Sequence, residues 1–295
     1  MNKLSNFNKG FLSAFGMAFC FSMIGILGVL VYQGGASPIT LLIGRAFIGT
    51  ILFFLTVFFL KKKSFKIERK DVVRLLIHSS VLVVHLVLCW NAINIIRHIP
   101  TVYAIHFTYP IWIFIMAALF LKEKINKKKI ASLSLGIIGV LFVIQFLPAI
   151  SLVGISLIGV GLMLLASLFW AIYLLYGQVL LEKYNLFTIL FYNFLVCFIA
   201  FFLMQGISTT ISELTIPVIK YIVLMGVITT YLAYLLYYFA IKKIGVVNTS
   251  IINLVVPFLG AVLAFLVLKQ TITLFQLLGI TLITSGVYLL YKKYD

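Results

Sequence analysis

Residues 99–125 read IPTVYAIHFTYPIWIFIMAALFLKEKI, and residues 246–272 read VVNTSIINLVVPFLGAVLAFLVLKQTI. The two apolar stretches align at a constant offset of 147 residues, which pairs Pro110 with Pro257. The same offset continues into the next apolar segment. Internal repetition at a long period predicts a chain built from two similar halves, and in so apolar a sequence it indicates a duplicated membrane unit.

The composition is typical of a polytopic membrane protein. Of the 295 residues, 64% are hydrophobic and 10% are charged, whereas soluble domains have roughly 45–50% apolar and about 25% charged residues. A spanning helix needs about 20 mainly apolar residues. The expected fold is therefore all-α, with a five-helix repeat over residues 1–147 and another over residues 148–295. The ten predicted spans are residues 10–31, 38–60, 72–95, 100–121, 130–146, 154–181, 187–204, 216–241, 247–268 and 274–291.

Basic residues are unevenly distributed among the predicted loops. If the chain begins in the cytoplasm, that side receives 19 of the 23 Lys and Arg residues, whereas Arg97, Lys220 and Lys269 face outside. The positive-inside rule therefore predicts that both termini are cytoplasmic. Each repeat has an odd number of spans, so the second copy is expected to cross the membrane upside down. The bias also accounts for the net charge of +17, and we expect no nucleic-acid partner.

The predicted spans lack the side chains that catalysis and metal binding need. The six Asp and Glu residues all lie in predicted loops or at the carboxyl terminus. The sequence contains no HExxH, GxSxG or phosphate-binding loop motif. We therefore expect a protein that is not an enzyme and that needs neither a metal nor another cofactor.

Several motifs are distributed along the whole chain. They are GRAF at residues 44–47, the spacing of Pro110 and Glu123, and the glycines of LGIIGV and ITSGV. Together they resemble the EamA-type transporters of the drug/metabolite transporter superfamily, although Gln270 stands where the pattern has Glu. The resemblance implies an exporter or exchanger of small metabolites. It also implies a central cavity lined mainly by the first, third, fourth, sixth, eighth and ninth helices.

Polar side chains fall on one face of the predicted spans that would line such a cavity. His85 lies on the third span, and Tyr103 and His106 share a face of the fourth. The repeat offset pairs Tyr103 with Ser250 and His106 with Asn253. Polar groups within a span usually face protein or a water-filled cavity. Inverted repeats commonly enclose a substrate site and open it alternately to each side, so these five residues are predicted to bind substrate.

Aromatic residues supply a second set of candidates. Trp170 and Tyr173 share a face of the sixth span, and Tyr234 lies on the eighth. Aromatic faces attract cations without a formal countercharge, so this lining would suit a substrate with an apolar or cationic part. Core packing is the alternative, because stripes of aromatic residues at helical spacing also occur in buried cores. We include all three among the predicted substrate-binding residues.

Histidine and proline are the candidates for coupling and motion. With no carboxylate in a span, His85 and His106 are the groups that could carry a proton; alternatively, they are neutral hydrogen-bonding groups. Pro110 and Pro257 interrupt backbone hydrogen bonding at equivalent places and are predicted to be paired hinges, with static kinks as the alternative. Arg45 is the only formal charge within a span. It either bonds to backbone carbonyls or binds an anionic part of the substrate.

The sequence leaves the substrate open. An amino acid, a nucleotide derivative such as S-adenosylmethionine and an amphipathic drug all fit this lining, and a lipid or lipid-precursor flippase is the alternative function. We expect a multi-pass protein of the bacterial cytoplasmic (inner) membrane. Ser132, Gly136 and Gly139 give the fifth span a small-residue face. That face could pack within the monomer or form a homodimer.

Overall fold

The computed structural model describes residues 3–60, 67–96, 99–123, 125–144, 156–269 and 273–292, and these are helical without any strand. Eight helical segments in the described chain are long and apolar enough to cross a membrane. The helices are α1 (Lys3–Ser22), α2 (Ile24–Gln33), α3 (Pro38–Leu60), α4 (Arg69–Ile96), α5 (Ile99–His106), α6 (Tyr109–Phe120), α7 (Lys127–Val143), α9 (Leu157–Lys183), α10 (Leu186–Gln205), α11 (Ile207–Ser212), α12 (Ile216–Met225), a π-helix (Gly226–Leu232), α13 (Ala233–Asn253), α14 (Val256–Leu268) and α15 (Leu274–Tyr291).

The longest of these segments, Ile216–Asn253, bends sharply inside α13. Gly245 has φ 79° and ψ 161°, a left-handed conformation that glycine adopts without steric cost. The helix before Gly245 contains the predicted span 216–241, and the stretch after Gly245, together with α14, contains the predicted span 247–268. Of the predicted span 130–146, residues 130–143 lie in α7, and residues 145–146 lie outside the described chain.

Both prolines that align across the repeats lie just after a helix break. The break before Pro110 is at residues 107–108, between α5 and α6, and the break before Pro257 is at residues 254–255, between α13 and α14. Proline suits the first turn of a helix, because its missing N–H would have no intrahelical partner there. The two interruptions therefore fall at equivalent positions of the repeats. Whether these joints move during function stays a prediction.

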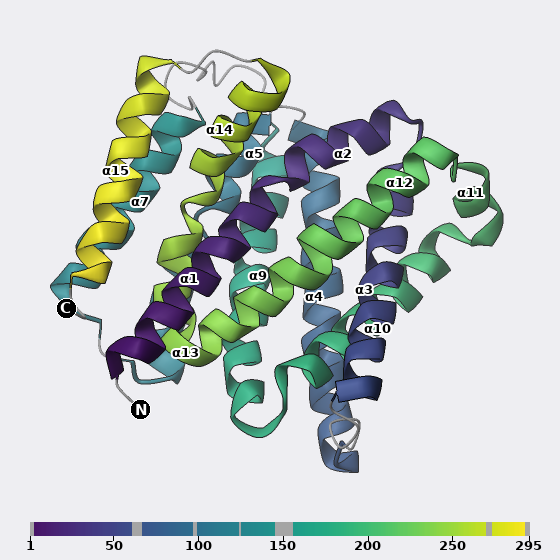
Figure 1. The fold of residues 1–295 in the computed structure, drawn as a ribbon, viewed down its shortest axis with the longest axis horizontal. Coiled ribbons are helices and arrows are strands. Elements are labelled where there is room, and N and C mark those ends of the chain that lie inside the picture. Colours follow the sequence, from purple (N-terminus) through teal and green to yellow (C-terminus); the bar gives the residue numbers. More distant parts are fainter. Residues whose placement is uncertain are drawn as a thin grey trace.

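The helix packing follows a two-fold relation between the halves. The offset of 147 residues pairs α7 with α15 and α3 with α10, and each of these pairs packs together. It also relates the packing of α4 on α9 to that of α13 on α1. In Figure 1, α7 and α15 lie side by side at one edge of the bundle and α3 and α10 at the other. The arrangement is that of two repeats placed around a common axis.

The contact between α7 and α15 uses the small-residue face that the sequence left open. A Cβ atom at Gly279 would lie 2.5 Å from the carbonyl oxygen of Gly139, and one at Gly286 would lie 2.8 Å from that of Ser132. The two helices run antiparallel, because the start of α7 meets the end of α15. The face of α7 is therefore occupied within the monomer.

We expect Gly279→Ala to destabilise the protein. The added methyl group would also lie 2.7 Å from the backbone nitrogen of Val143, so the helices must separate to accept it. Overpacking of this kind costs about 1–3 kcal/mol. Gly161→Ala is the matched control, since a Cβ there meets nothing within 4 Å. Thermal unfolding of the purified protein should show a lower Tm for Gly279→Ala only; equal Tm values would contradict the packing argument.

In Figure 1 the α9–α10 turn and the start of α4 lie at the end of the bundle where α1 begins and α15 ends. Lys183 at the end of α9 contacts Glu68 at 2.8 Å and Asp71 at 2.5 Å, and Tyr184 donates to Asp71 at 2.7 Å. Hydrogen bonds from Lys183 and Lys70 lower the pKa of Glu68. We call the end of the bundle where α1 begins and α15 ends the terminal end. Its contacts tie the α9–α10 turn to the start of α4.

The opposite end has an equivalent contact made by a single carboxylate. Ser37, between α2 and α3, donates its backbone N–H and its hydroxyl to Glu213, each at 2.8 Å. Burial acts to raise the pKa of Glu213, but hydrogen bonds from Thr40, Ser37 and Gln205 outweigh it and lower that pKa. The repeat offset relates this α2–α3 turn to the α9–α10 turn. The two ends of the bundle are therefore fixed by side-chain contacts at equivalent turns of the two repeats.

Candidate functional site

The candidate site lies where α5, α6, α9 and α13 meet, around the buried ring of Tyr109. The ring centroid of Tyr109 lies 5.6 Å from that of His106 and 6.5 Å from that of Trp170. Its hydroxyl oxygen accepts a hydrogen bond of 2.7 Å from the side-chain amide of Asn253. Asn253 belongs to the second half of the chain and Tyr109 to the first. The site therefore joins the two halves of the molecule.

Most of the predicted binding residues belong to this cluster. The ring of His85 lies 4.9 Å from Trp170 and 5.7 Å from His106, centroid to centroid. The indole of Trp170 lies 5.3 Å from the ring of Tyr173 and 6.1 Å from that of Tyr234. We use the name central cluster for the following set. Its members are His85, His106, Tyr109, Trp170, Tyr173, Tyr234 and Asn253.

Three polar atoms of the central cluster are buried and have no hydrogen-bond partner in the described part of the chain. They are Nδ1 of His106, Nε1 of Trp170 and Oδ1 of Asn253. Leaving such an atom unpaired costs about 1–3 kcal/mol. The indole nitrogen can only donate, the amide oxygen can only accept, and the imidazole nitrogen can do either. The three atoms thus offer one donor, one acceptor and one group that can be either.

Two predicted residues lie apart from the cluster. Ser250 is buried, but its hydroxyl donates to the carbonyl of Val247 at 2.8 Å, within its own helix. Tyr103 stacks on Phe107 at 6.2 Å and leaves 36% of its surface exposed. The offset that pairs these residues in sequence therefore does not give them equivalent surroundings. Neither side chain contacts the central cluster through a described hydrogen bond.

The two histidines are placed differently within the cluster. Nδ1 of His85 lies 2.8 Å from the carbonyl oxygen of Ala166, and because a carbonyl can only accept, this nitrogen carries the proton and donates. The bond joins α4 to α9. His106 packs edge to face on Phe107, with ring centroids 5.6 Å apart. This placement supports a hydrogen-bonding role for His85, whereas proton transfer by either ring stays a hypothesis.

A polar network beside the cluster was only partly visible in the sequence. His78 falls on the same helix face as His85, but its partners come from distant helices. Its Nδ1 lies 3.0 Å from Oδ1 of Asn193, and its Nε2 lies 3.0 Å from the carbonyl oxygen of Tyr173. The side-chain amide of Asn193 in turn donates to the hydroxyl of Tyr173 at 2.9 Å. The network fixes α4, α9 and α10 around one side of the site.

A hydrogen bond between α9 and α13, which the sequence did not indicate, lies on the side of the site toward the terminal end. Gln178 on α9 accepts a hydrogen bond of 2.6 Å from the backbone N–H of Val246. The reversal at Gly245 starts a new helical stretch, so this N–H has no partner within its helix. Gln178 thus caps a helical stretch of its own repeat, because Gln178 and Val246 both lie in the second half of the chain. The two halves are held together at the bond between Tyr109 and Asn253.

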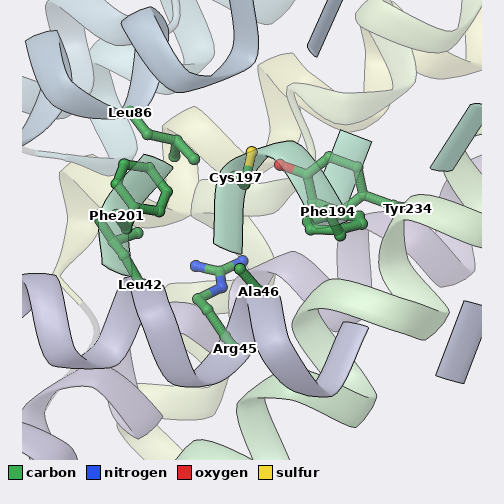
Figure 2. Close-up of a pocket in the computed structure, with 8 residues that line it drawn as sticks. All are labelled: Leu42, Arg45, Ala46, Leu86, Phe194, Cys197, Phe201 and Tyr234. Atoms are coloured by element: carbon green, nitrogen blue, oxygen red, sulfur yellow. The ribbon is translucent and has the colours of Figure 1, made fainter. Parts of the chain in front are cut away.

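Arg45 is placed beside the central cluster (Figure 2). Its Nε donates to Oγ1 of Thr230 at 3.0 Å, and its Nη2 donates to the carbonyl oxygen of Thr229 at 3.4 Å. Both threonines belong to the π-helix. A charged side chain at the centre of a spanning helix costs about 2.5–3.5 kcal/mol on insertion scales. One of the two alternatives predicted for Arg45, a hydrogen bond to a backbone carbonyl, is present. This bond offsets part of the cost of burying the charge.

Comparison with known proteins identifies the family. The model of the EamA-like transporter family matches residues 8–145 and again residues 157–292. An uncharacterized transporter of Clostridium kluyveri is 31% identical over 63% of this chain and 60% of its own length. One from Archaeoglobus fulgidus is 26% identical over 62% of this chain and 64% of its own length. The matched region thus spans less than two thirds of each relative.

A solved crystal structure with 13% sequence identity has the same fold. Its TM-score is 0.77, and the match covers 98% of this chain and 99% of that chain. The double family match confirms the internal duplication, and the names of the relatives are those of transporters. With its long apolar helices, the protein is a multi-pass membrane protein and belongs to the EamA-like transporter family.

Proposed function

We propose that the protein carries a small organic solute across the membrane by alternating access, with the solute bound at the central cluster. The observation that carries this proposal is the set of unpaired buried atoms of His106, Trp170 and Asn253. They come from both halves of the chain and meet where the halves touch. A solute that satisfies them would bind near the midplane, as is common for inverted repeats.

The proposed topology has ten crossings and both termini in the cytoplasm. The break at Gly245 supports counting Ile216–Asn253 as two crossings that continue into α14. We assign the first repeat to residues 1–147 and the second to residues 148–295. Basic side chains gather at the terminal end, which supports a cytoplasmic location for it. The membrane we propose is a bacterial cytoplasmic membrane.

Alternating access would separate the two halves at one end and then at the other. The Tyr109–Asn253 bond joins the two halves at the central cluster. Moving the halves apart there requires this bond to break. The matched helix breaks before Pro110 and Pro257 are suited to act as hinges, because few backbone hydrogen bonds cross them. The protein would then work as an exporter or an exchanger.

The test is solute counterflow with the full-length protein in proteoliposomes, using a panel of amino acids, nucleotide derivatives and amphipathic cations. We expect trans-stimulated uptake of at least one solute above the rate of protein-free liposomes. Saturation by unlabelled solute on the same side should abolish the signal. Absence of uptake for every class, with correctly inserted protein, would overturn the proposal.

Transport is expected to proceed without a pH gradient. The proton on His85 is held by the carbonyl of Ala166, and neither cluster histidine forms an ion pair with a carboxylate of the described residues. Counterflow of the identified solute should be equal with and without an imposed gradient. His85→Gln and His106→Gln should change its apparent affinity and leave its pH profile in place. A pH profile that flattens in either variant would instead assign that histidine to proton coupling.

A lipid or lipid-precursor flippase is the second candidate, and one surface feature favours it. An apolar cavity of ≈360 Å³ lies between α1, α14 and α15. It is lined by Phe11, Phe15, Val255, Phe258, Thr284, Val287, Tyr288 and Tyr291. Dithionite quenching of a fluorescent phospholipid in proteoliposomes separates the two functions. Protein-dependent loss of the protected inner-leaflet signal would indicate a flippase.

A further inference from the structure

Arg45 has more hydrogen-bond donors than the surrounding protein uses. A guanidinium carries five N–H groups. Two of them are engaged, by Thr230 and by the carbonyl of Thr229. None of the ion pairs formed by the described residues includes Arg45. A permanent positive charge is thus held within a membrane protein by two neutral oxygens, with donors left for another group.

The free side of the guanidinium faces a small cavity that borders the central cluster. The cavity has a volume of ≈10 Å³, room for about one water-sized group. Figure 2 shows the guanidinium pointing into it from α3, with Tyr234 at the far side. Its walls are Leu42, Arg45, Ala46, Leu86, Phe194, Cys197, Phe201 and Tyr234. Because Tyr234 also packs on Trp170, this cavity and the proposed solute site share a wall.

From this geometry we infer that Arg45 binds a carboxylate of the transported solute, and that the solutes are organic acids or zwitterions with an apolar body. This inference rests on the proposed function. A carboxylate supplies the missing countercharge and can accept two parallel N–H bonds from the planar guanidinium fork. The apolar body would then lie against Phe194, Tyr234 and Trp170. Lysine at this position would keep the charge and lose the fork.

The test compares acids with the corresponding amides, which lack the carboxylate, as ligands of the full-length protein in detergent. The pairs are phenylacetate and phenylacetamide, L-phenylalanine and L-phenylalaninamide, and succinate and succinamide, with binding followed by the ligand-induced rise in Tm. Charge-assisted hydrogen bonds predict a preference of roughly tenfold or more for the acid in at least one pair. The preference should disappear in Arg45→Gln and weaken in Arg45→Lys.

Thr230→Val provides the control for a purely structural role. It removes the oxygen that Nε of Arg45 contacts and leaves the guanidinium in place, so it should keep the preference for the acid. A preference that is absent from wild type in all three pairs, or that survives in Arg45→Gln, would overturn the inference. Counterflow decides the proposed function separately. Counterflow of the acids that is unaffected by Arg45→Gln would uphold transport and reject the carboxylate site.

Discussion

Asn253→Ala is expected to lower counterflow of the identified solute by roughly tenfold or more. The substitution removes one hydrogen bond and one free acceptor. The amide nitrogen of Asn253 no longer donates to Tyr109, and the unpaired Oδ1 that we propose binds the solute is lost. The hydroxyl of Tyr109 is then left buried without its donor. Initial rates of counterflow at several solute concentrations would show whether affinity, turnover or both have changed.

Two further variants sharpen this experiment. Asn91→Ala is the matched control, because Asn91 is exposed and its side chain bonds only to the carbonyl of Val87 in its own helix. It should behave as wild type. Tyr109→Phe removes the hydroxyl alone, and the double variant with Asn253→Ala measures the coupling between the two side chains. Wild-type rates in Asn253→Ala would remove Asn253 from the site.

Gln178→Ala is expected to loosen the terminal end of the site. Val246 is fully buried, and its N–H loses its partner when the amide is removed. A buried unpaired donor costs about 1–3 kcal/mol, which corresponds to an increase of about 5–150-fold in local opening of the helical stretch that follows Gly245. Hydrogen–deuterium exchange of the peptide containing residues 246–250 should become faster. Exchange in α7 should stay unchanged.

Gln178→Glu is the matched variant for this contact. Its carboxylate oxygen can still accept the bond from Val246, so exchange in residues 246–250 should remain close to wild type. If both variants exchange as wild type does, the bond does not stabilise the helical stretch that follows Gly245. If both exchange faster, the shape of the glutamine side chain matters more than its acceptor. Only the pattern of a fast Ala variant and a slow Glu variant supports the cap.

The repeat offset predicted part of the site for a physical reason. Duplicated helices keep the same inward face, so His106 and Asn253, which the offset pairs, both reach the region where the halves meet. The offset also pairs Tyr103 with Ser250, but these two side chains lie apart from the central cluster. Ser250 bonds within its own helix, and Tyr103 lies toward the surface. Similar positions in two repeats share a backbone location but do not share neighbours.

Tyr109 and Gln178 could not have been found by the same reasoning. Tyr109 is one of 15 tyrosines, and the offset pairs it with an apolar residue, Val256. The only local signal was its place directly before Pro110, at the helix break. Gln178 matters because of the left-handed turn at Gly245, which leaves the backbone N–H of Val246 without a partner in its own helix. That turn could not be assigned from a glycine among 20 in the sequence.

The sequence by itself determined the membrane character, the duplication and the family resemblance, because apolar runs and a constant offset are properties of the chain that need no third dimension. The tertiary structure decided which side chains share a site. It brought Tyr109, Trp170 and Asn253 together, turned α7 onto α15, and placed Arg45 beside a cavity instead of against a carboxylate of the described chain. These outcomes depend on helix breaks and on the rotation of each helix about its axis. Both are set by packing between segments far apart in the sequence, which local patterns do not encode.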